Sequence, residues 1–252
     1  MLLQVLYGAG IGISLALTGA GGSVIALPVL VYLLGIDPHA ATGTSLVVVG
    51  LNAASAAVSF ARAGLVRWRI GGFFALAGAL GAVAGSAVNP RVPAAALMGG
   101  LAVFMGIVAV RMLRHEETAV GDAACLEPLE ARLRLGISGF SVGFLTGLFG
   151  VGGGFLVVPS LVILLECPMR QAIGTSLFVI ALNSLWGVAA RLGGLGAIDL
   201  GPVPGLVLGG VIGATAGARL TARIDPKPFV RGFAVFLILV AIYVVVRTAR
   251  GG

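Results

Sequence analysis

The 252-residue chain is poor in charged residues: Asp, Glu, Lys and Arg make up 10% of it, whereas 59% of its residues are hydrophobic. Soluble globular domains carry about 25% charged residues, so this composition excludes an ordinary soluble fold. The mean hydropathy is +1.12, and apolar runs of membrane-spanning length recur along the chain, which indicates a polytopic membrane protein. Strand-like alternation of apolar and polar residues is nearly absent, which favours helices over a barrel.

Residues that carry most enzyme and metal chemistry are also scarce. The chain has two histidines, and its two cysteines, Cys125 and Cys167, have neither disulfide nor metal-ligand spacing. No Ser-His-Asp set and no carboxylate pair occurs at a usable spacing, so we predict neither enzymatic activity nor a cofactor. The net charge of +7 comes from basic residues scattered singly over short loops, which membrane topology explains better than nucleic-acid binding.

Glycine, in contrast, is abundant, with 41 residues, and it marks an internal duplication. The cluster GAGGS at residues 19–23 returns 131 residues later as GVGGG at residues 150–154, and a proline follows each cluster at the same distance. From Gly12 to Asn52, 18 of 41 positions are identical to their partners 131 residues further on. A similarity that holds at one offset over such a stretch indicates two repeats of one structural unit.

The first transmembrane repeat spans residues 1–113 and the second spans residues 133–252, with a hydrophilic linker of residues 114–132 between them. Five apolar segments in each repeat predict an all-α fold, in which a glycine-broken helical hairpin is followed by three transmembrane helices. The expected segments are residues 2–17, 23–36, 41–61, 70–88 and 93–113, and then 133–149, 154–167, 172–191, 202–220 and 229–247.

Each glycine cluster is either a break within one long span or the tip of a hairpin, and the basic residues favour the hairpin. With hairpins, 12 of the 16 Lys and Arg residues fall on one side of the membrane and 4 on the other, whereas broken spans split them 10 to 6. Because Lys and Arg concentrate in cytoplasmic loops, we expect hairpins, with both termini facing away from the cytoplasm. Each repeat then has an odd number of segments, so the second repeat is inverted relative to the first, as in many secondary transporters.

Both repeats carry groups suited to binding a small anion near the middle of the membrane. Glycine N–H groups at the turns, together with the positive ends of the helices that follow, favour an anion. A Gly-Thr-Ser-Leu motif and an asparagine on the next helix supply neutral hydrogen-bond donors, which suit an oxyanion without burying a countercharge. The predicted substrate-binding residues are Gly21, Gly22, Thr44, Ser45, Asn52, Gly152, Gly153, Thr175, Ser176 and Asn183.

These features also have a structural interpretation. The glycine clusters fit tight turns, and single Ser or Thr hydroxyls commonly bond one membrane helix to another. Charged residues such as Asp37, His39, Arg62 and Arg170 lie at segment ends, where an interfacial position explains them. Further glycines have the spacing of closely packed helices, namely Gly78, Gly81 and Gly85 in the first repeat and Gly209, Gly213 and Gly217 in the second.

The paired motifs resemble those of the TauE/SafE family of sulfite exporters. The best matches are residues 150–159 (GVGGGFLVVP) and 171–177 (QAIGTSL), and the resemblance covers nearly the whole chain. It implies an integral protein of the bacterial cytoplasmic (inner) membrane that transports sulfur-containing anions such as sulfite, sulfoacetate or related sulfonates. The first repeat departs from the pattern, with Ser23 in the place of Gly154, close to the expected substrate contacts.

We therefore expect a secondary transporter that exports small sulfur-containing anions by alternating access. The expected partners are the substrate anion and the lipid bilayer, with no nucleic acid, and a homodimer is left open. One alternative is a passive anion channel on the same scaffold, because no obvious coupling acid lies within a span. A membrane-embedded enzyme or assembly factor is the other alternative.

Overall fold

The computed structural model describes residues 1–19, 21–88, 91–114, 130–149, 154–163, 165, 167–190 and 199–223, together with 231–232, 234–235, 238–239 and 241–242. Every regular element within these ranges is helical. The first repeat forms α1 (Leu2–Thr18), α2 (Gly21–Pro28), the π-helical η1 (Val29–Leu33), α3 (Pro38–Arg62), α4 (Trp68–Val88) and α5 (Ala94–Arg114). The second repeat forms α6 (Glu130–Phe149), α7 (Gly154–Ile163), α8 (Met169–Ala190) and α9 (Val203–Arg223).

These helices confirm the predicted segments from residue 2 to residue 220. The last expected segment, residues 229–247, and most of the linker lie outside the described residues. In the part of the chain that the structure describes, four helices are long and apolar enough to cross a membrane, over Gly43–Arg62, Trp68–Gly85, Met169–Ala189 and Val203–Thr221.

Large apolar side chains cover the outer faces of these helices. Leu80 and Val83 on α4 are each 70% exposed, and Ile212 on α9 is 62% exposed. An apolar surface of this extent is unfavourable in water and matches the hydrocarbon interior of a bilayer. The chain is therefore an integral membrane protein with its core between the helices and its apolar surface toward lipid.

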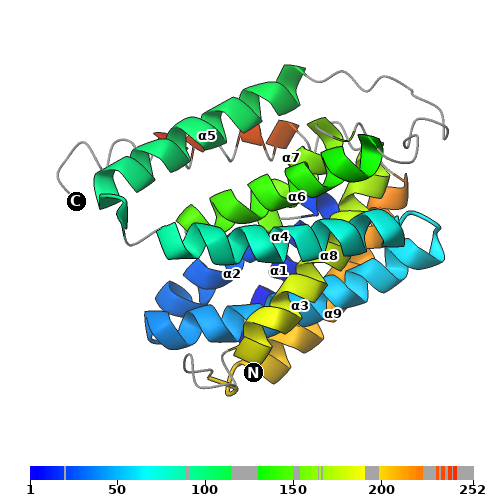
Figure 1. The fold of residues 1–252 in the computed structure, drawn as a ribbon. Helices are drawn as coiled ribbons and strands as arrows, with labels where there is room; N and C mark the ends of the chain where they lie inside the picture. Colours follow the sequence, from blue (N-terminus) through cyan, green and yellow to red (C-terminus); the bar gives the residue numbers. More distant parts are fainter. Residues whose placement is uncertain are drawn as a thin grey trace.

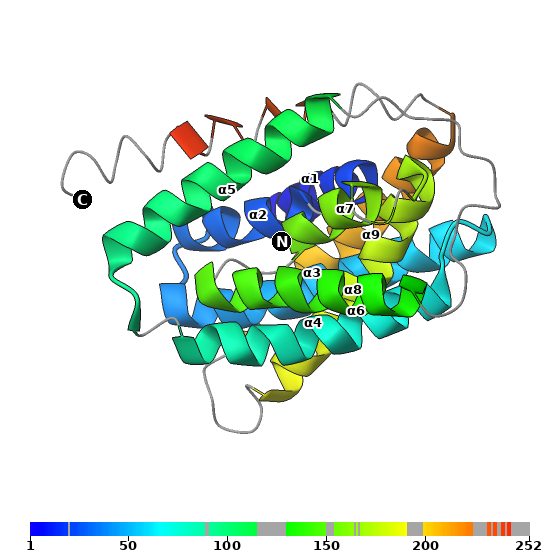
Figure 2. The same ribbon diagram turned by 45° about the horizontal axis from the view of Figure 1, so that its top comes forward.

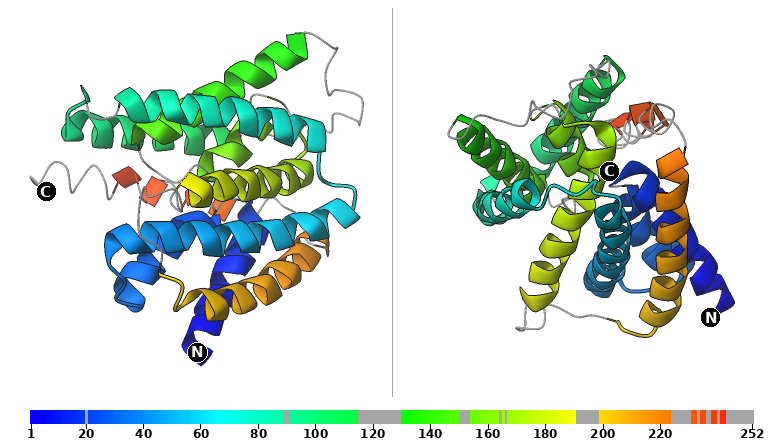
Figure 3. Two further views of the ribbon diagram at one scale, coloured as in Figure 1. Left: turned by 60° about the horizontal axis from the view of Figure 1, so that its bottom comes forward. Right: turned by 90° about the vertical axis from the view of Figure 1, so that its right-hand side faces the viewer.

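Six helices form a row in which each one packs against the next, in the order α1, α9, α3, α8, α4 and α6. The central pair α3 and α8 lies between the α1/α9 pair and the α4/α6 pair (Figures 1 and 3). If each helix is exchanged for its equivalent in the other repeat, the order reads the same from either end. The first helix of each repeat thus packs against the fourth helix of the other. α5 contacts α6 and α7 at the edge of the molecule (Figure 2).

Glycines allow α1 and α9 to touch backbone to backbone. Gly209 lies against the carbonyl oxygen of Val5, and Gly213 lies against that of Ala9. A side chain at either glycine would collide with the opposite backbone. The contacts advance in the same direction along both helices, so α1 and α9 run parallel.

The α4/α6 pair is built in the same way. Gly81 lies against the carbonyl oxygen of Phe140, and Gly85 lies against that of Phe144. In return, Gly143 of α6 contacts the backbone of Gly78. These contacts confirm the helix packing that the glycine spacing predicts, in both repeats.

The chain folds back at the first glycine cluster. α1 ends at Gly19, whose φ of 72° is left-handed and whose N–H donates to the carbonyl oxygen of Leu15 at 2.8 Å. Glycine adopts this conformation without the steric cost that other residues meet. Gly22, at the start of α2, then packs against Ile11 and Leu15 of α1. A break within one continuous span would carry Gly22 away from these residues, so the first cluster is a hairpin turn.

The same wide turn follows η1 in the first repeat and α7 in the second. The N–H of Ile36 donates to the carbonyl oxygen of Leu30 at 3.1 Å, and the N–H of Cys167 donates to that of Leu161 at 3.0 Å. Each residue of the first bond lies 131 positions before its partner in the second. The duplicated sequence therefore folds into the same local structure in the two repeats.

Substituting alanine for two glycines of α4 tests the backbone contact. A β-carbon at Gly81 would meet the backbone of Phe140 and the nitrogen of Phe144, the latter at 2.8 Å, whereas one at Gly72 would meet nothing within 4 Å. We expect Gly81→Ala to lower the free energy of unfolding by about 1–3 kcal/mol through overpacking. Gly72→Ala should be neutral or slightly stabilising, because alanine favours a helix. Thermal unfolding in detergent measures both, and equal melting temperatures would contradict the close contact.

Candidate functional site

The central helices α3 and α8 are equivalent in the two repeats and pack antiparallel. Leu46 lies against Gly187, Gly50 against Ser184, and Phe60 against Gly174. The contacts advance along α3 while they move backward along α8. Asn52 and Asn183, the two predicted amide donors, both fall near the middle of this shared length.

Asn52 is fully buried, and neither polar atom of its amide has a hydrogen-bond partner. Its side chain lies directly against Gly210 of α9, where a β-carbon would collide with the amide. An unpaired buried polar group costs about 1–3 kcal/mol, and the hydrocarbon interior of a bilayer offers no water to pair it. Asn52 therefore has unused hydrogen-bonding capacity at the position where a substrate contact is predicted.

Asn183 has different surroundings. It is half-buried on α8. The two repeats are offset by 132 residues in this part of the chain, so the glycine equivalent to Gly210 is Gly78 on α4. A β-carbon at Gly78 would meet only the carbonyl oxygen of Gly139, at 3.4 Å. The Asn52 amide is thus closed against α9, whereas Asn183 makes no such contact with α4.

Thr44 and Thr175 join the two repeats reciprocally. The hydroxyl of Thr175 accepts a hydrogen bond from the N–H of Arg67 in the α3–α4 connection at 3.1 Å. The hydroxyl of Thr44 accepts from the N–H of Asp199 in the α8–α9 connection at 3.0 Å and lies 2.9 Å from its carbonyl oxygen. Each threonine ties the start of a central helix to a loop of the other repeat. Because α3 and α8 are antiparallel, the two threonines lie at opposite ends of the pair, and the structure does not bring them together.

Ser176 holds the first glycine turn. Its hydroxyl lies 3.0 Å from the carbonyl oxygen of Gly19 and 2.8 Å from that of Ile173, so it bonds α8 to the end of α1. Among the other predicted residues, Gly21 begins α2, Gly22 is buried against α1, and Ser45 is half-buried on α3. Gly152 and Gly153 lie outside the described residues.

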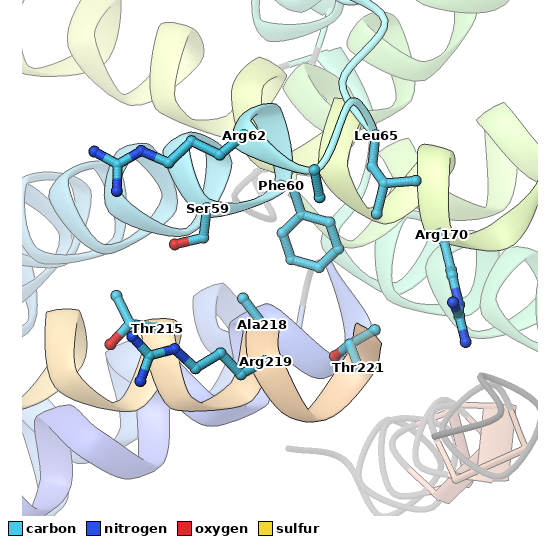
Figure 4. Close-up of a pocket in the computed structure, with 10 residues that line it drawn as sticks. Ser59, Phe60, Arg62, Leu65, Arg170, Thr215, Ala218, Arg219 and Thr221 are labelled. Carbon is cyan, nitrogen blue, oxygen red and sulfur yellow. The ribbon is translucent and has the colours of Figure 1, made fainter. Parts of the chain in front are cut away.

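A pocket of about 320 Å³ opens where the end of α3, the start of α8 and the last turns of α9 meet (Figure 4). It brings together Arg62, Arg170 and Arg219, which all belong to the 12 basic residues that the hairpin topology predicts on one side of the membrane. The lining residues are Ser59, Phe60, Arg62, Ala63, Leu65, Arg170, Thr215, Ala218, Arg219 and Thr221.

Two further polar residues of α3, Ser55 and Ser59, were not among the predicted contacts, although helical spacing offered a signal. They follow Asn52 by three and seven residues, which places all three side chains on one face of α3. Gly210 carries no such signal, because its role depends on how α9 packs against α3. Within the described ranges, no group of three His, Cys, Asp or Glu side chains is placed to hold a metal ion.

Two substitutions at Thr175 separate a structural role from substrate binding. Thr175→Val removes the acceptor of the Arg67 N–H, so we expect the free energy of unfolding to fall by about 1–3 kcal/mol. Thr175→Ser keeps the hydroxyl and should retain most of the stability. Melting temperatures in detergent give the comparison. A Thr175→Val protein with unchanged stability but weakened substrate binding would show that the hydroxyl serves the ligand instead.

Comparison with known proteins agrees with these features. The family model described as sulfite exporter TauE/SafE matches residues 4–244. A "Probable membrane transporter protein" of Xylella fastidiosa (strain 9a5c) is 34% identical, over 98% of this chain and 96% of its own length. The "Probable membrane transporter protein YunE" of Bacillus subtilis (strain 168) is 27% identical, over 82% and 85% respectively. No solved structure matches the chain. The resemblance that the glycine turns and Gly-Thr-Ser-Leu motifs indicate is thereby confirmed, and the chain belongs to the sulfite exporter TauE/SafE family of membrane transporters.

Proposed function

We propose that the chain is a secondary transporter of small sulfur-containing anions, such as sulfite, sulfoacetate or related sulfonates, and that it exports them across the bacterial cytoplasmic membrane. The observation that carries this proposal is the Asn52 amide, fully buried in a spanning helix with no partner for either polar atom. An amide N–H donates to an oxyanion without placing a countercharge in the membrane. The family description suggests the class of anion, and the unpartnered Asn52 amide offers a hydrogen-bonding site for it.

The arrangement of α3 and α8 supports an inverted repeat. Both helices are long enough to span the membrane, they are equivalent in the duplicated sequence, and they pack antiparallel. A two-fold axis that relates two antiparallel spanning helices lies in the plane of the membrane, as in many secondary transporters. Such an axis would pass near Asn52 and Asn183, so an anion close to it could receive a hydrogen bond from each repeat.

The unequal surroundings of the two asparagines support alternating access. Asn52 closes against Gly210, whereas the equivalent approach of Asn183 to Gly78 is absent in this conformation. Glycine at both positions leaves room for either amide to approach the neighbouring helix. If the closed contact passed from one repeat to the other, the site would open alternately to the two sides of the membrane.

Replacing both asparagines with leucine tests the site. We expect the Asn52→Leu/Asn183→Leu variant to lose sulfite efflux from proteoliposomes while remaining folded, because removing an unpaired buried amide does not destabilise the protein. The melting temperature should be unchanged or higher. Thr146→Val is a matched control, since it removes another buried, unpartnered polar atom, from α6, and should leave efflux intact. Unchanged efflux in the double variant would remove the asparagines from the site.

A pH gradient distinguishes a carrier from a passive channel. The channel remains an alternative because neither α3 nor α8 contains an Asp or Glu that could couple transport to protons. A proton-coupled carrier should accumulate sulfite inside proteoliposomes above the concentration that passive equilibration gives at the imposed pH difference. Sulfite that only equilibrates under that gradient would favour the channel.

A further inference from the structure

The pocket at the α3, α8 and α9 ends is strongly basic. Among the described residues that line it, ten in number, three are arginines and none is acidic. Figure 4 shows Arg62 and Arg219 extending in the same direction from α3 and α9, on either side of the Ser59 hydroxyl, while Arg170 lies on the other side of Phe60. Cationic side chains that surround a concave site raise the local concentration of anions. The volume of about 320 Å³ lies within the range of about 300–1,000 Å³ of small-molecule sites.

A stripe of polar groups leads inward from this pocket. Ser59 lines it, and Ser55 and Asn52 follow on the same face of α3. The Ser55 hydroxyl and the Asn52 amide are both buried and have no partner. On the opposite helix, α9, Thr215 lines the pocket and Gly210 contacts Asn52. At about 1.5 Å per residue, the stripe covers about 10 Å along α3.

The duplicated fold does not require these groups. The residues equivalent to Ser59, Thr215 and Arg219 in the other repeat are Ala190, Val83 and Ala87. Cytoplasmic placement of arginine likewise does not demand that three of them share one pocket. The basic pocket and its polar stripe are therefore specific to one end of the molecule.

We propose that this pocket is the cytoplasmic vestibule of the transporter, where Arg62, Arg170 and Arg219 capture a hydrated oxyanion. Ser59 and Ser55 then replace part of its hydration as it moves between α3 and α9 toward Asn52. Guanidinium groups suit this step because their N–H groups match the geometry of oxyanions. The inference rests on the proposed function for the identity of the cargo, whereas binding at the pocket requires only an oxyanion.

Sulfate binding measured by thermal unfolding tests the vestibule without transport. At constant ionic strength, sulfate should raise the melting temperature of the wild-type protein in a neutral detergent, because a ligand of the folded state stabilises it. Arg62→Gln/Arg219→Gln should increase the half-saturating sulfate concentration at least tenfold, and Arg62→Lys/Arg219→Lys, which keeps both charges, should increase it less. Arg69→Gln is a matched control, because Arg69 is exposed near the same end and does not line the pocket. An unchanged sulfate response in the double glutamine variant would overturn the proposal.

Anionic lipid headgroups share this chemistry, so lipid composition forms a second arm. In nanodiscs of phosphatidylcholine alone, sulfate should stabilise the wild-type protein, and adding phosphatidylglycerol should leave its half-saturating concentration unchanged. If phosphatidylglycerol abolishes the sulfate response, and the double glutamine variant loses sensitivity to that lipid, the pocket binds headgroups and the proposal is wrong.

Transport distinguishes this inference from the proposed function. In proteoliposomes, the double glutamine variant should need about tenfold more sulfite for half-maximal flux out of the arginine-lined side. A wild-type protein that moves no sulfite would refute the proposed function, yet the sulfate titration would still decide whether the pocket binds an oxyanion.

Discussion

Close contact between helix backbones is the constraint on which the structure depends. Inside a bilayer, lipid tails are as apolar as leucine, so helices gain little from hiding apolar side chains from one another. Association must come from packing, and glycine allows two backbones to approach most closely. Here Gly209 and Gly213 hold α1 to α9, and Gly81 and Gly85 hold α4 to α6. Both contacts join one repeat to the other, so the two halves form one body around α3 and α8.

Hydrogen bonds at the ends of the central helices follow the same rule. Thr44 and Thr175 each satisfy a backbone N–H in a loop of the opposite repeat, and Ser176 bonds the end of α1. These three hydroxyls are thus consumed in joining the halves. Near the middle of α3, in contrast, Ser55 and Asn52 remain unpartnered, as does Thr146 on α6. Of the unpartnered residues, Ser55 and Asn52 share the face of α3 that leads to the basic pocket.

Much of the fold follows from local sequence. Apolar runs predict the helices, and the glycine cluster at residues 19–23, together with the charge count, predicts the first hairpin, where the structure has a left-handed Gly19. The site is less accessible to such reasoning. The Gly-Thr-Ser-Leu motifs look alike, but antiparallel packing of α3 and α8 sends Thr44 and Thr175 to opposite ends. Likewise, Arg62 lies more than a hundred residues before Arg170 and Arg219 in the sequence, and only the tertiary fold places the three around one pocket.

The exchange of first and fourth helices between repeats also bears on how the protein is made. α1 is synthesised first, yet its parallel partner α9 follows about 200 residues later. At a synthesis rate of about 5–20 residues per second, α1 waits at least about 10 seconds in the membrane before Gly209 and Gly213 reach it. During that interval, the face of α1 that later contacts α9 is exposed to lipid or to other membrane proteins. Completion of the fold is therefore a late event, and a chain that stops after the first repeat leaves α1 and α4 without their partners α9 and α6.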